Sequence, residues 1–171
     1  MKIRTPRLTI TRFNLDMAQI VYGNSQDDDT RRFVPDEVYD SAEEAREAIE
    51  FLMSRYDSAD GPFVYPVLTN GGKNIGYVQL CRLDDGKWEI GYHIAKDFTG
   101  KGFATEAVKA FLPVIAQNQN LKEVYGICLA ENLASIRVLE KCGFRQIYKG
   151  LGNYQGQEAQ IIKAIRKNYN F

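Results

Sequence analysis

The stretch of sequence that decides the fold runs from residue 88 to residue 107: Trp88-Glu89-Ile90-Gly91-Tyr92-His93-Ile94-Ala95, Lys96-Asp97-Phe98-Thr99, Gly100-Lys101-Gly102-Phe103-Ala104-Thr105-Glu106-Ala107. It predicts a strand, a short polar loop and a glycine-rich turn that opens a helix. The first turn of a helix has N–H groups without partners, and the macrodipole adds about half a positive charge there. Gly100 and Gly102 let the backbone approach a phosphate, and Ala104 is small enough not to crowd it. The stretch predicts an anion site, although a tight turn alone also explains the glycines.

Two common phosphate-binding motifs do not fit this turn. A Walker loop requires G-x-x-x-x-G-K-[ST], which the sequence lacks. A Rossmann fingerprint requires a third Gly or Ala where Thr105 stands, and it opens the first strand–helix unit of its domain. This turn lies beyond the middle of the chain. A dinucleotide oxidoreductase is therefore disfavoured.

Outward from the turn, hydrophobic periodicity predicts the remaining elements. The expected strands cover residues 8–13, 63–68, 75–83, 87–95, 124–129, 144–148 and 159–165; the expected helices cover about 16–22, 41–56, 102–117 and 132–143. Ser41 and Glu44 have the spacing of a capping box, and Asn132 suits an N-cap. Pro113 should bend or shorten its helix. This order predicts an α/β or α+β domain with a mixed sheet.

Length and composition fit one globular domain over residues 1–171, since the chain has 171 residues and 44% hydrophobic content. We expect no membrane segment, because no apolar run approaches about 18 residues, and no signal peptide. The three cysteines, Cys81, Cys128 and Cys142, form no C-x-x-C pair, so neither a disulfide framework nor a metal site is predicted. A reducing cytoplasm is the expected location.

Charge is balanced overall but unevenly placed. From Asp27 to Asp60 there are twelve acids and four arginines, so this region carries 4 − 12 = −8, and the rest carries +8 because the totals are 22 and 22. A net charge of zero argues against nucleic acid as a partner. The asymmetry suits an enzyme with an anionic cofactor and a cationic substrate. A solvated acidic helix with its loops explains it equally well.

Two segments together resemble the GNAT superfamily of acetyltransferases. Thr99-Gly100-Lys101-Gly102-Phe103-Ala104 resembles motif A, [QR]-x-x-G-x-[GA]. Asn132-Leu133-Ala134-Ser135-Ile136-Arg137-Val138-Leu139-Glu140-Lys141-Cys142-Gly143-Phe144 resembles motif B, N-x-x-S-x-x-x-L-E-K-x-G-F. With Pro6-Arg7-Leu8, the chain is similar to the Rim-type branch, the N-acetyltransferases of ribosomal protein N-termini and their relatives. The resemblance covers nearly the whole chain. It implies one GNAT-type domain with a mixed, mostly antiparallel sheet of about seven strands and about four helices.

The resemblance also implies a reaction. An acetyl group passes from acetyl-CoA to a primary amine, a small molecule or a protein N-terminus, by direct attack in a ternary complex without a metal. A non-catalytic acyl-CoA-binding or sensor module is the alternative. A homodimer is common among relatives. The implied cofactor-binding residues are Ile94, Thr99, Gly100, Lys101, Gly102, Phe103, Ala104, Thr105, Asn132 and Ser135. Surface cations that could contact the 3′-phosphate are Lys101, Lys109, Arg137 and Lys141.

The chain departs from the family pattern at two positions. Thr99 replaces the usual Gln or Arg of motif A, which removes one side-chain contact to the cofactor and leaves the backbone cradle. Leu139 stands where many members carry a tyrosine that acts as general acid. The proton for the departing thiolate must then come from another group or from solvent.

Glu89 is the candidate general base, acting through a water, because an amine with a pKa near about 10 must lose a proton to attack. Strand alternation places Glu89 on the same face as His93 and opposite Tyr92. His93 is the rival base, since its ordinary pKa is closer to neutral. Exposed or packed side chains are the non-catalytic interpretations of both residues, and a bulge in the strand would reverse the faces.

Ser135 is the candidate donor to the thiolate, because the family places this serine near the sulfur and Asn132 near the pantetheine arm. Helix capping alone also explains Asn132. Cys128 and Cys142 are expected to pack in the core, since nothing nearby marks an activated thiolate. The acidic region falls where the family builds its acceptor cleft, and Tyr154 either lines that cleft or closes a hairpin.

Overall fold

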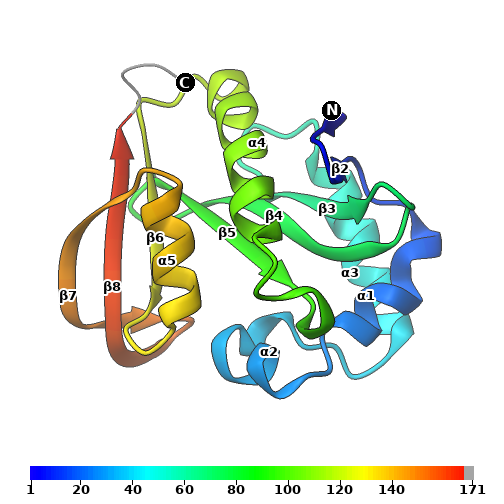
Figure 1. Cartoon of the computed structure of the whole chain (residues 1–171), viewed down its shortest axis with the longest axis horizontal. Helices are drawn as coiled ribbons and strands as arrows, with labels where there is room; N and C mark the ends of the chain where they lie inside the picture. Colours follow the sequence, from blue (N-terminus) through cyan, green and yellow to red (C-terminus); the bar gives the residue numbers. More distant parts are fainter. Residues whose placement is uncertain (168–171) are drawn as a thin grey trace.

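The computed structural model describes residues 1–167, and the strands in this part of the chain form one sheet of eight (Figure 1). The strands are β1 (Ile3–Arg4), β2 (Leu8–Ile10), β3 (Phe63–Thr69), β4 (Asn74–Arg82), β5 (Trp88–Ile94), β6 (Glu123–Leu129), β7 (Arg145–Tyr154) and β8 (Gln157–Lys167). Their order across the sheet is β1-β2-β3-β4-β5-β6-β8-β7, and only β5 and β6 are parallel neighbours. The predicted mixed, mostly antiparallel sheet is confirmed, with one strand more than expected because the two-residue β1 is too short to show a period.

Five α-helices accompany the sheet in the described residues: α1 (Ala18–Asn24), α2 (Asp28–Phe33), α3 (Ala42–Arg55), α4 (Phe103–Asn118) and α5 (Leu133–Lys141). Helices α4 and α5 cover one face, and α1 and α3 cover the other (Figure 1). The sequence missed α2, because six residues are too few to show helical periodicity. Its signal is a cap: the Asp27 side chain accepts a hydrogen bond from the Thr30 amide. No described helix has the length and apolar content to cross a membrane.

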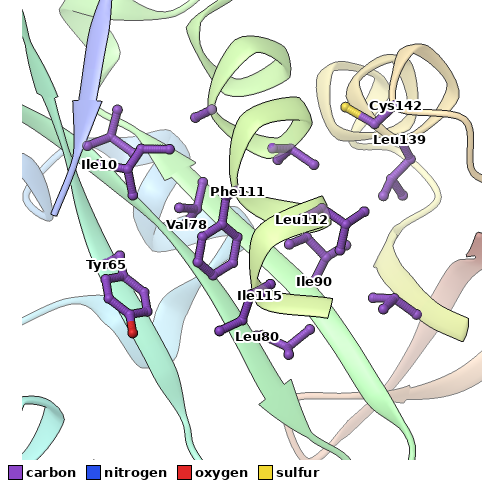
Figure 2. Packing of buried hydrophobic residues seen from close by; sticks show 14 of the residues in the cluster. Ile10, Tyr65, Val78, Leu80, Ile90, Phe111, Leu112, Ile115, Leu139 and Cys142 are labelled. Carbon is purple, nitrogen blue, oxygen red and sulfur yellow. The ribbon is translucent and has the colours of Figure 1, made fainter. Parts of the chain in front are cut away.

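The main core lies between α4 and the central strands. Phe111, Leu112 and Ile115 of α4 pack over strand residues such as Leu80 and Ile90 (Figure 2). The helix continues through Pro113 to Asn118, so the proline does not shorten it. A proline inside a helix costs about 3 kcal/mol, whereas burying each large apolar side chain contributes about 1.5–3 kcal/mol. Packing against the sheet therefore outweighs the missing hydrogen bond.

The C-terminal hairpin is longer than predicted. Strands were expected at 144–148 and 159–165, whereas β7 and β8 pair from Arg145↔Ile165 to Tyr154↔Gln157. Most β7 side chains are exposed, so the strand carries no apolar alternation from which its length can be read. Its pairing with β8 sets its length and places Tyr154 at the end of the hairpin.

Candidate active site

The parallel strands β5 and β6 start side by side and then separate. In the described part of the chain they pair at one position, Glu89 with Tyr125. The Ala95 amide donates to the Ile75 carbonyl on β4. Because hydrogen-bonding direction alternates along an antiparallel ladder, the main-chain groups of Ile94 point away from β4, towards the opening. They are placed to bond a ligand that lies along β5.

A cavity of about 330 Å³ lies at this opening. Its lining includes the predicted residues Glu89, Asn132 and Ser135, but not His93. Tyr154 also lines it, and the same residue closes the β7–β8 hairpin by pairing with Gln157. A larger hollow of about 680 Å³ beside β1 and the end of α4 contains none of the predicted site residues. The chemistry-bearing side chains therefore gather in the smaller cavity.

Glu89 is a half-buried cavity residue and not a fully exposed surface glutamate. Its Oε1 accepts a hydrogen bond of 3.1 Å from the Ile127 amide on β6. Burial raises the pKa of Glu89 to about 7, although the Ile127 amide and the charge of Lys163 act to lower it. A carboxylate with a pKa near 7 can accept a proton at neutral pH and release it again.

His93 shares the face of Glu89, as predicted, because β4 and β5 pair without a bulge. The His93 side chain is nevertheless bonded to α2 and does not line the cavity of Glu89. Its Nε2 lies 2.8 Å from Thr30 Oγ1, and Thr30 donates its own proton to Asp27. Nε2 must then donate to Thr30, so it is not free to accept a proton. Burial also lowers the pKa of His93, against the opposing charge of Asp27. The structure does not bring His93 together with Glu89 and Ser135.

Ser135 sits in the first turn of α5, where Asn132 caps the helix as predicted. The Asn132 Oδ1 accepts the Ser135 amide at 3.0 Å. The Tyr92 hydroxyl lies 2.8 Å from Ser135 Oγ and 3.0 Å from the Ser135 carbonyl oxygen. No motif in the sequence marks Tyr92 for a role. Its only sequence signal was strand parity, which points it away from Glu89 and towards the helix face of the sheet.

The predicted anion turn is built as the glycines suggest. Gly100 and Gly102 have φ angles of 73° and 79°, in the left-handed region that favours glycine. Gly102 is the N-cap of α4, and no described side chain caps this helix. The Thr99 hydroxyl donates to the Lys96 carbonyl and the Lys101 ammonium to the Asp97 carbonyl, both at 2.8 Å. The Lys96 carbonyl also accepts the Thr99 amide at 3.2 Å, so both donors of Thr99 are bonded within the loop.

Arg7 braces this turn from the segment just before β2, which gives the Pro6-Arg7-Leu8 segment a role that the sequence alone did not show. Its Nε donates to Glu106 at 2.6 Å and its Nη1 to the Lys101 carbonyl at 2.9 Å. The guanidinium also lies over the Phe103 ring, 4.4 Å from its centre. Pairing with Arg7 offsets the negative charge that Glu106 brings to the helix start.

The surface beside the turn carries two of the four cations that were candidates for a phosphate contact. Lys109 and Lys141 line a shallow hollow at the start of α4, together with Gly102 and Thr105. Lys101 and Arg137 are not among the residues that line this hollow. Backbone donors and two lysines thus face the same space.

Residues 27–37, which we call the α2 strap, cross the cavity and are tied to three other elements. Besides the Thr30–His93 contact, Arg32 pairs with Glu131 at 2.9 Å. The Tyr154 hydroxyl donates to the Phe33 carbonyl at 2.6 Å. The strap ends in the 3-10 turn Pro35–Glu37, which supplies Asp36 and Glu37 to the cavity lining.

Glu37 is the most deeply placed carboxyl of the strap. Burial and the charge of Asp36 raise the pKa of Glu37 to about 7. The side chains of Tyr77 and Gln79 on β4 contact the carboxylate and act in the opposite direction. With Glu89, the cavity therefore has three carboxyl groups, and its lining within residues 1–167 includes no lysine or arginine.

Solved structures share this fold. A GNAT-family acetyltransferase from Bacillus anthracis has a TM-score of 0.82 and 22% identity, covering 98% of both chains. RimL, a ribosomal L7/L12 alpha-N-protein acetyltransferase in complex with coenzyme A, has a TM-score of 0.83 and 15% identity, also covering 98% of both chains. At sequence identities of 22% and 15%, these similarities show that the fold is shared and nothing more.

Sequence comparison identifies the family. The uncharacterized N-acetyltransferase YnaD of Bacillus subtilis (strain 168) is 29% identical over 148 residues, which cover 85% of this chain and 84% of that protein. Residues 7–145 match the acetyltransferase (GNAT) domain model, and this range contains the anion turn, the β5–β6 opening and the α5 cap. The chain therefore belongs to the GNAT family of acetyltransferases.

Proposed function

We propose that the protein transfers the acetyl group of acetyl-CoA to a primary amine by direct attack in a ternary complex. The observation that carries this proposal is the placing of Glu89 and Ser135 in one cavity at the β5–β6 opening. We also propose that residues 1–171 act as one catalytic domain in the cytoplasm.

The residues present fit acetyl-CoA. The main-chain donors from Gly100 to Thr105 suit a pyrophosphate, because helix N-termini bind phosphates through backbone N–H groups. The Ile94 main chain faces the opening and suits the amides of the pantetheine arm. The bound thioester supplies the activated carbonyl that the amine attacks. The proposed contacts are made by Ile94, Thr99, Gly100, Lys101, Gly102, Phe103, Ala104, Thr105, Asn132 and Ser135.

In the proposed reaction Glu89 takes the proton of the attacking amine, directly or through a water. The nitrogen–carbon bond forms, the carbon–sulfur bond breaks, and sulfur leaves with the electron pair. The Ser135 hydroxyl donates a hydrogen bond to that thiolate. Burial raises the pKa of Cys128 and of Cys142 to about 11, so both remain protonated thiols at neutral pH. This supports direct attack over an acyl-cysteine intermediate.

The charge of the cavity supports a cationic acceptor. Asp36, Glu37 and Glu89 line it without a balancing lysine or arginine in the lining, as described above. An ammonium group would offset carboxylate charge in a partly buried site. Small diamines and polyamines fit this chemistry. The name of RimL, an alpha-N-protein acetyltransferase, supports a protein N-terminus as the other acceptor class.

A thiol-release assay tests the proposal. The protein is incubated with acetyl-CoA and a panel of peptides with free N-termini, amino acids, diamines and polyamines, and the products are read by mass spectrometry. We expect one acceptor class to release CoA and gain an acetyl group, without acetylation of the protein itself. Tight binding of acetyl-CoA without turnover on any acceptor would favour the acyl-CoA sensor, which Leu139 and Thr99 also allow.

Replacing Arg7 by alanine is expected to raise the KM for acetyl-CoA about tenfold and to leave kcat nearly unchanged. The variant loses charge-assisted hydrogen bonds worth about 1.5–3 kcal/mol that hold the turn, and it leaves the charge of Glu106 without its cationic partner beside a phosphate. Steady-state kinetics with varied acetyl-CoA measure this change. The matched control is Arg12→Ala, which also breaks an ion pair and a cation–π contact, but far from the turn. Equal effects of the two substitutions would contradict the role of Arg7.

Replacing Glu37 by glutamine is expected to raise the KM for a diamine about tenfold, with a smaller effect on a monoamine of similar length. Because the raised pKa of Glu37 is about 7, its carboxylate is charged mainly above that pH. The discrimination between the two amines should therefore grow as the pH rises through 7 in the parent protein and stay flat in the variant. Glu47→Gln, which removes an exposed charge of the same acidic region, is the control.

A further inference from the structure

The helix that carries Ser135 has no acid at the position where related enzymes place a tyrosine. Leu139 occupies it, and its side chain is 3% exposed and packed into the core. A Cβ placed at Gly126 would clash with the Leu139 side chain, so the leucine fills the space between α5 and β6. The departing thiolate must therefore be stabilised by side chains at other positions.

The neighbouring strand supplies a phenol at this place. Tyr92 projects from β5 to α5, and its hydroxyl lies between two oxygens of the same residue, the Oγ and the carbonyl of Ser135, at 2.8 Å and 3.0 Å. Burial raises the pKa of Tyr92 well above its ordinary value, so the phenol keeps its proton. The side chain of Cys128 also contacts the Ser135 hydroxyl. All three side chains line the cavity that contains Glu89.

We propose that Tyr92 is a positioning residue that turns the hydroxyl hydrogen of Ser135 towards the sulfur atom that leaves acetyl-CoA. This inference rests on the proposed function. It assigns to Tyr92 and Ser135 together the place of the tyrosine that α5 lacks. Tyr92 has one proton and faces two acceptors. When the Tyr92 hydroxyl donates its hydrogen bond to Ser135 Oγ, the Ser135 hydroxyl no longer donates to Tyr92. The hydrogen of Ser135 is then free to point at the sulfur atom.

The step balances without a further reactant. The amine forms the nitrogen–carbon bond, Glu89 receives the amine proton, and the carbon–sulfur bond breaks with both electrons on sulfur. Ser135 donates a hydrogen bond to the thiolate, and Tyr92 donates one to Ser135. Neither hydroxyl loses its proton, because both are weaker acids than a thiol. The thiolate takes its proton from solvent after release. The two hydrogen bonds of this chain polarise each other, and each is therefore stronger than it would be alone.

Tyr92→Phe is expected to lower kcat about tenfold and to leave the KM for acetyl-CoA within about twofold, because the lost hydrogen bond acts on the departing sulfur and not on the bound cofactor. Tyr56→Phe is the matched control. It also removes a buried phenol, one that donates to the Val64 carbonyl at 2.8 Å and accepts from the Phe13 amide at 2.9 Å. A fall in kcat that is equal in both variants would assign the effect to lost packing and overturn the proposal.

A double-mutant cycle with Ser135→Ala separates positioning from stability. If Tyr92 acts through Ser135, the double variant should have the kcat of Ser135→Ala alone, since no hydroxyl remains to be turned. If the losses of the two single variants multiply, Tyr92 acts independently and the proposal fails. Thermal midpoints of all variants should be measured in the same samples.

A binding measurement tests the inference without turnover. At alkaline pH, where the thiol of CoA ionises, the parent protein should bind CoA more tightly than desulfo-CoA. Tyr92→Phe and Ser135→Ala should each reduce this preference severalfold in calorimetry. A preference in the parent protein that disappears in Tyr92→Phe, without turnover on any amine, would keep this inference and reject the proposed function. Normal turnover on an amine, together with an unchanged preference for CoA over desulfo-CoA in Tyr92→Phe, would keep the proposed function and reject this inference.

Discussion

Glu89→Gln is expected to lower kcat/KM for the amine about 100-fold or more. A positioned general base contributes about 10²–10⁴ to a rate. Glutamine keeps the shape of the side chain, and its Oε1 can still accept the hydrogen bond that the Ile127 amide now donates to Glu89. What the variant loses is the ability to take a proton. Initial rates at saturating acetyl-CoA, with the amine varied, measure the effect.

The pH profile gives this prediction its sharpest form. Because the pKa of Glu89 is raised to about 7, the carboxylate that accepts the proton is present mainly above that pH. The kcat/KM of the parent protein should fall tenfold per pH unit below 7, beyond the trend of the amine itself, and this limb should vanish in Glu89→Gln. An unchanged rate and an unchanged profile in the variant would show that another group is the base. Glu123→Gln, also on the sheet, is the control.

Stability serves as a check on the same variant. A carboxyl whose pKa is raised on folding binds more protons in the folded state, so it costs stability as pH rises from its unfolded value towards 7. Glutamine carries no charge at any pH. Above pH 7 the thermal midpoint of Glu89→Gln should therefore equal or exceed that of the parent protein. A lower midpoint at that pH would mean that the rate loss reports unfolding.

Gly102→Val is expected to weaken acetyl-CoA binding about 100-fold. The residue has a φ of 79°, where a β-branched side chain is strained. Any relaxation moves the first N–H groups of α4, which are the proposed pyrophosphate donors. Losing two hydrogen bonds to a charged group costs about 3 kcal/mol, or about two powers of ten. Calorimetric titration with acetyl-CoA measures the dissociation constant.

A second glycine controls for backbone strain. Gly86 lies in the turn between β4 and β5 with a φ of 80°, and a Cβ there would meet only the Arg82 side chain, at 3.9 Å. Gly86→Val therefore carries similar strain far from the anion turn. We expect it to lower the thermal midpoint as Gly102→Val does and to bind acetyl-CoA like the parent protein. Normal affinity in Gly102→Val would remove the basis of the proposed cofactor site.

Local sequence determined the parts of the site that lie within one element or between neighbouring elements. The turn from Thr99 to Thr105 combines a strand end, left-handed glycines and a helix start, and each of these follows from short-range sterics and periodicity. The cap of Asn132 on the Ser135 amide spans three residues. Strand alternation likewise placed Glu89 and His93 on one face. Burial of Glu89, which gives it the pKa of a base, was beyond these rules, because burial depends on the elements that pack around it.

Tertiary structure alone decided the contacts between residues distant in the chain. Tyr92 meets Ser135 across 43 positions, Arg7 meets Glu106 across 99, and Tyr154 meets Phe33 across 121. No local period encodes such pairs, because sheet order, strand register and helix packing set them. The same packing ties His93 to the α2 strap and keeps it from the cavity of Glu89. The sequence determined that a glycine-rich turn before a helix and a capped helix exist, and the packing of β5 between α5 and the strap decided which side chains meet in the cavity.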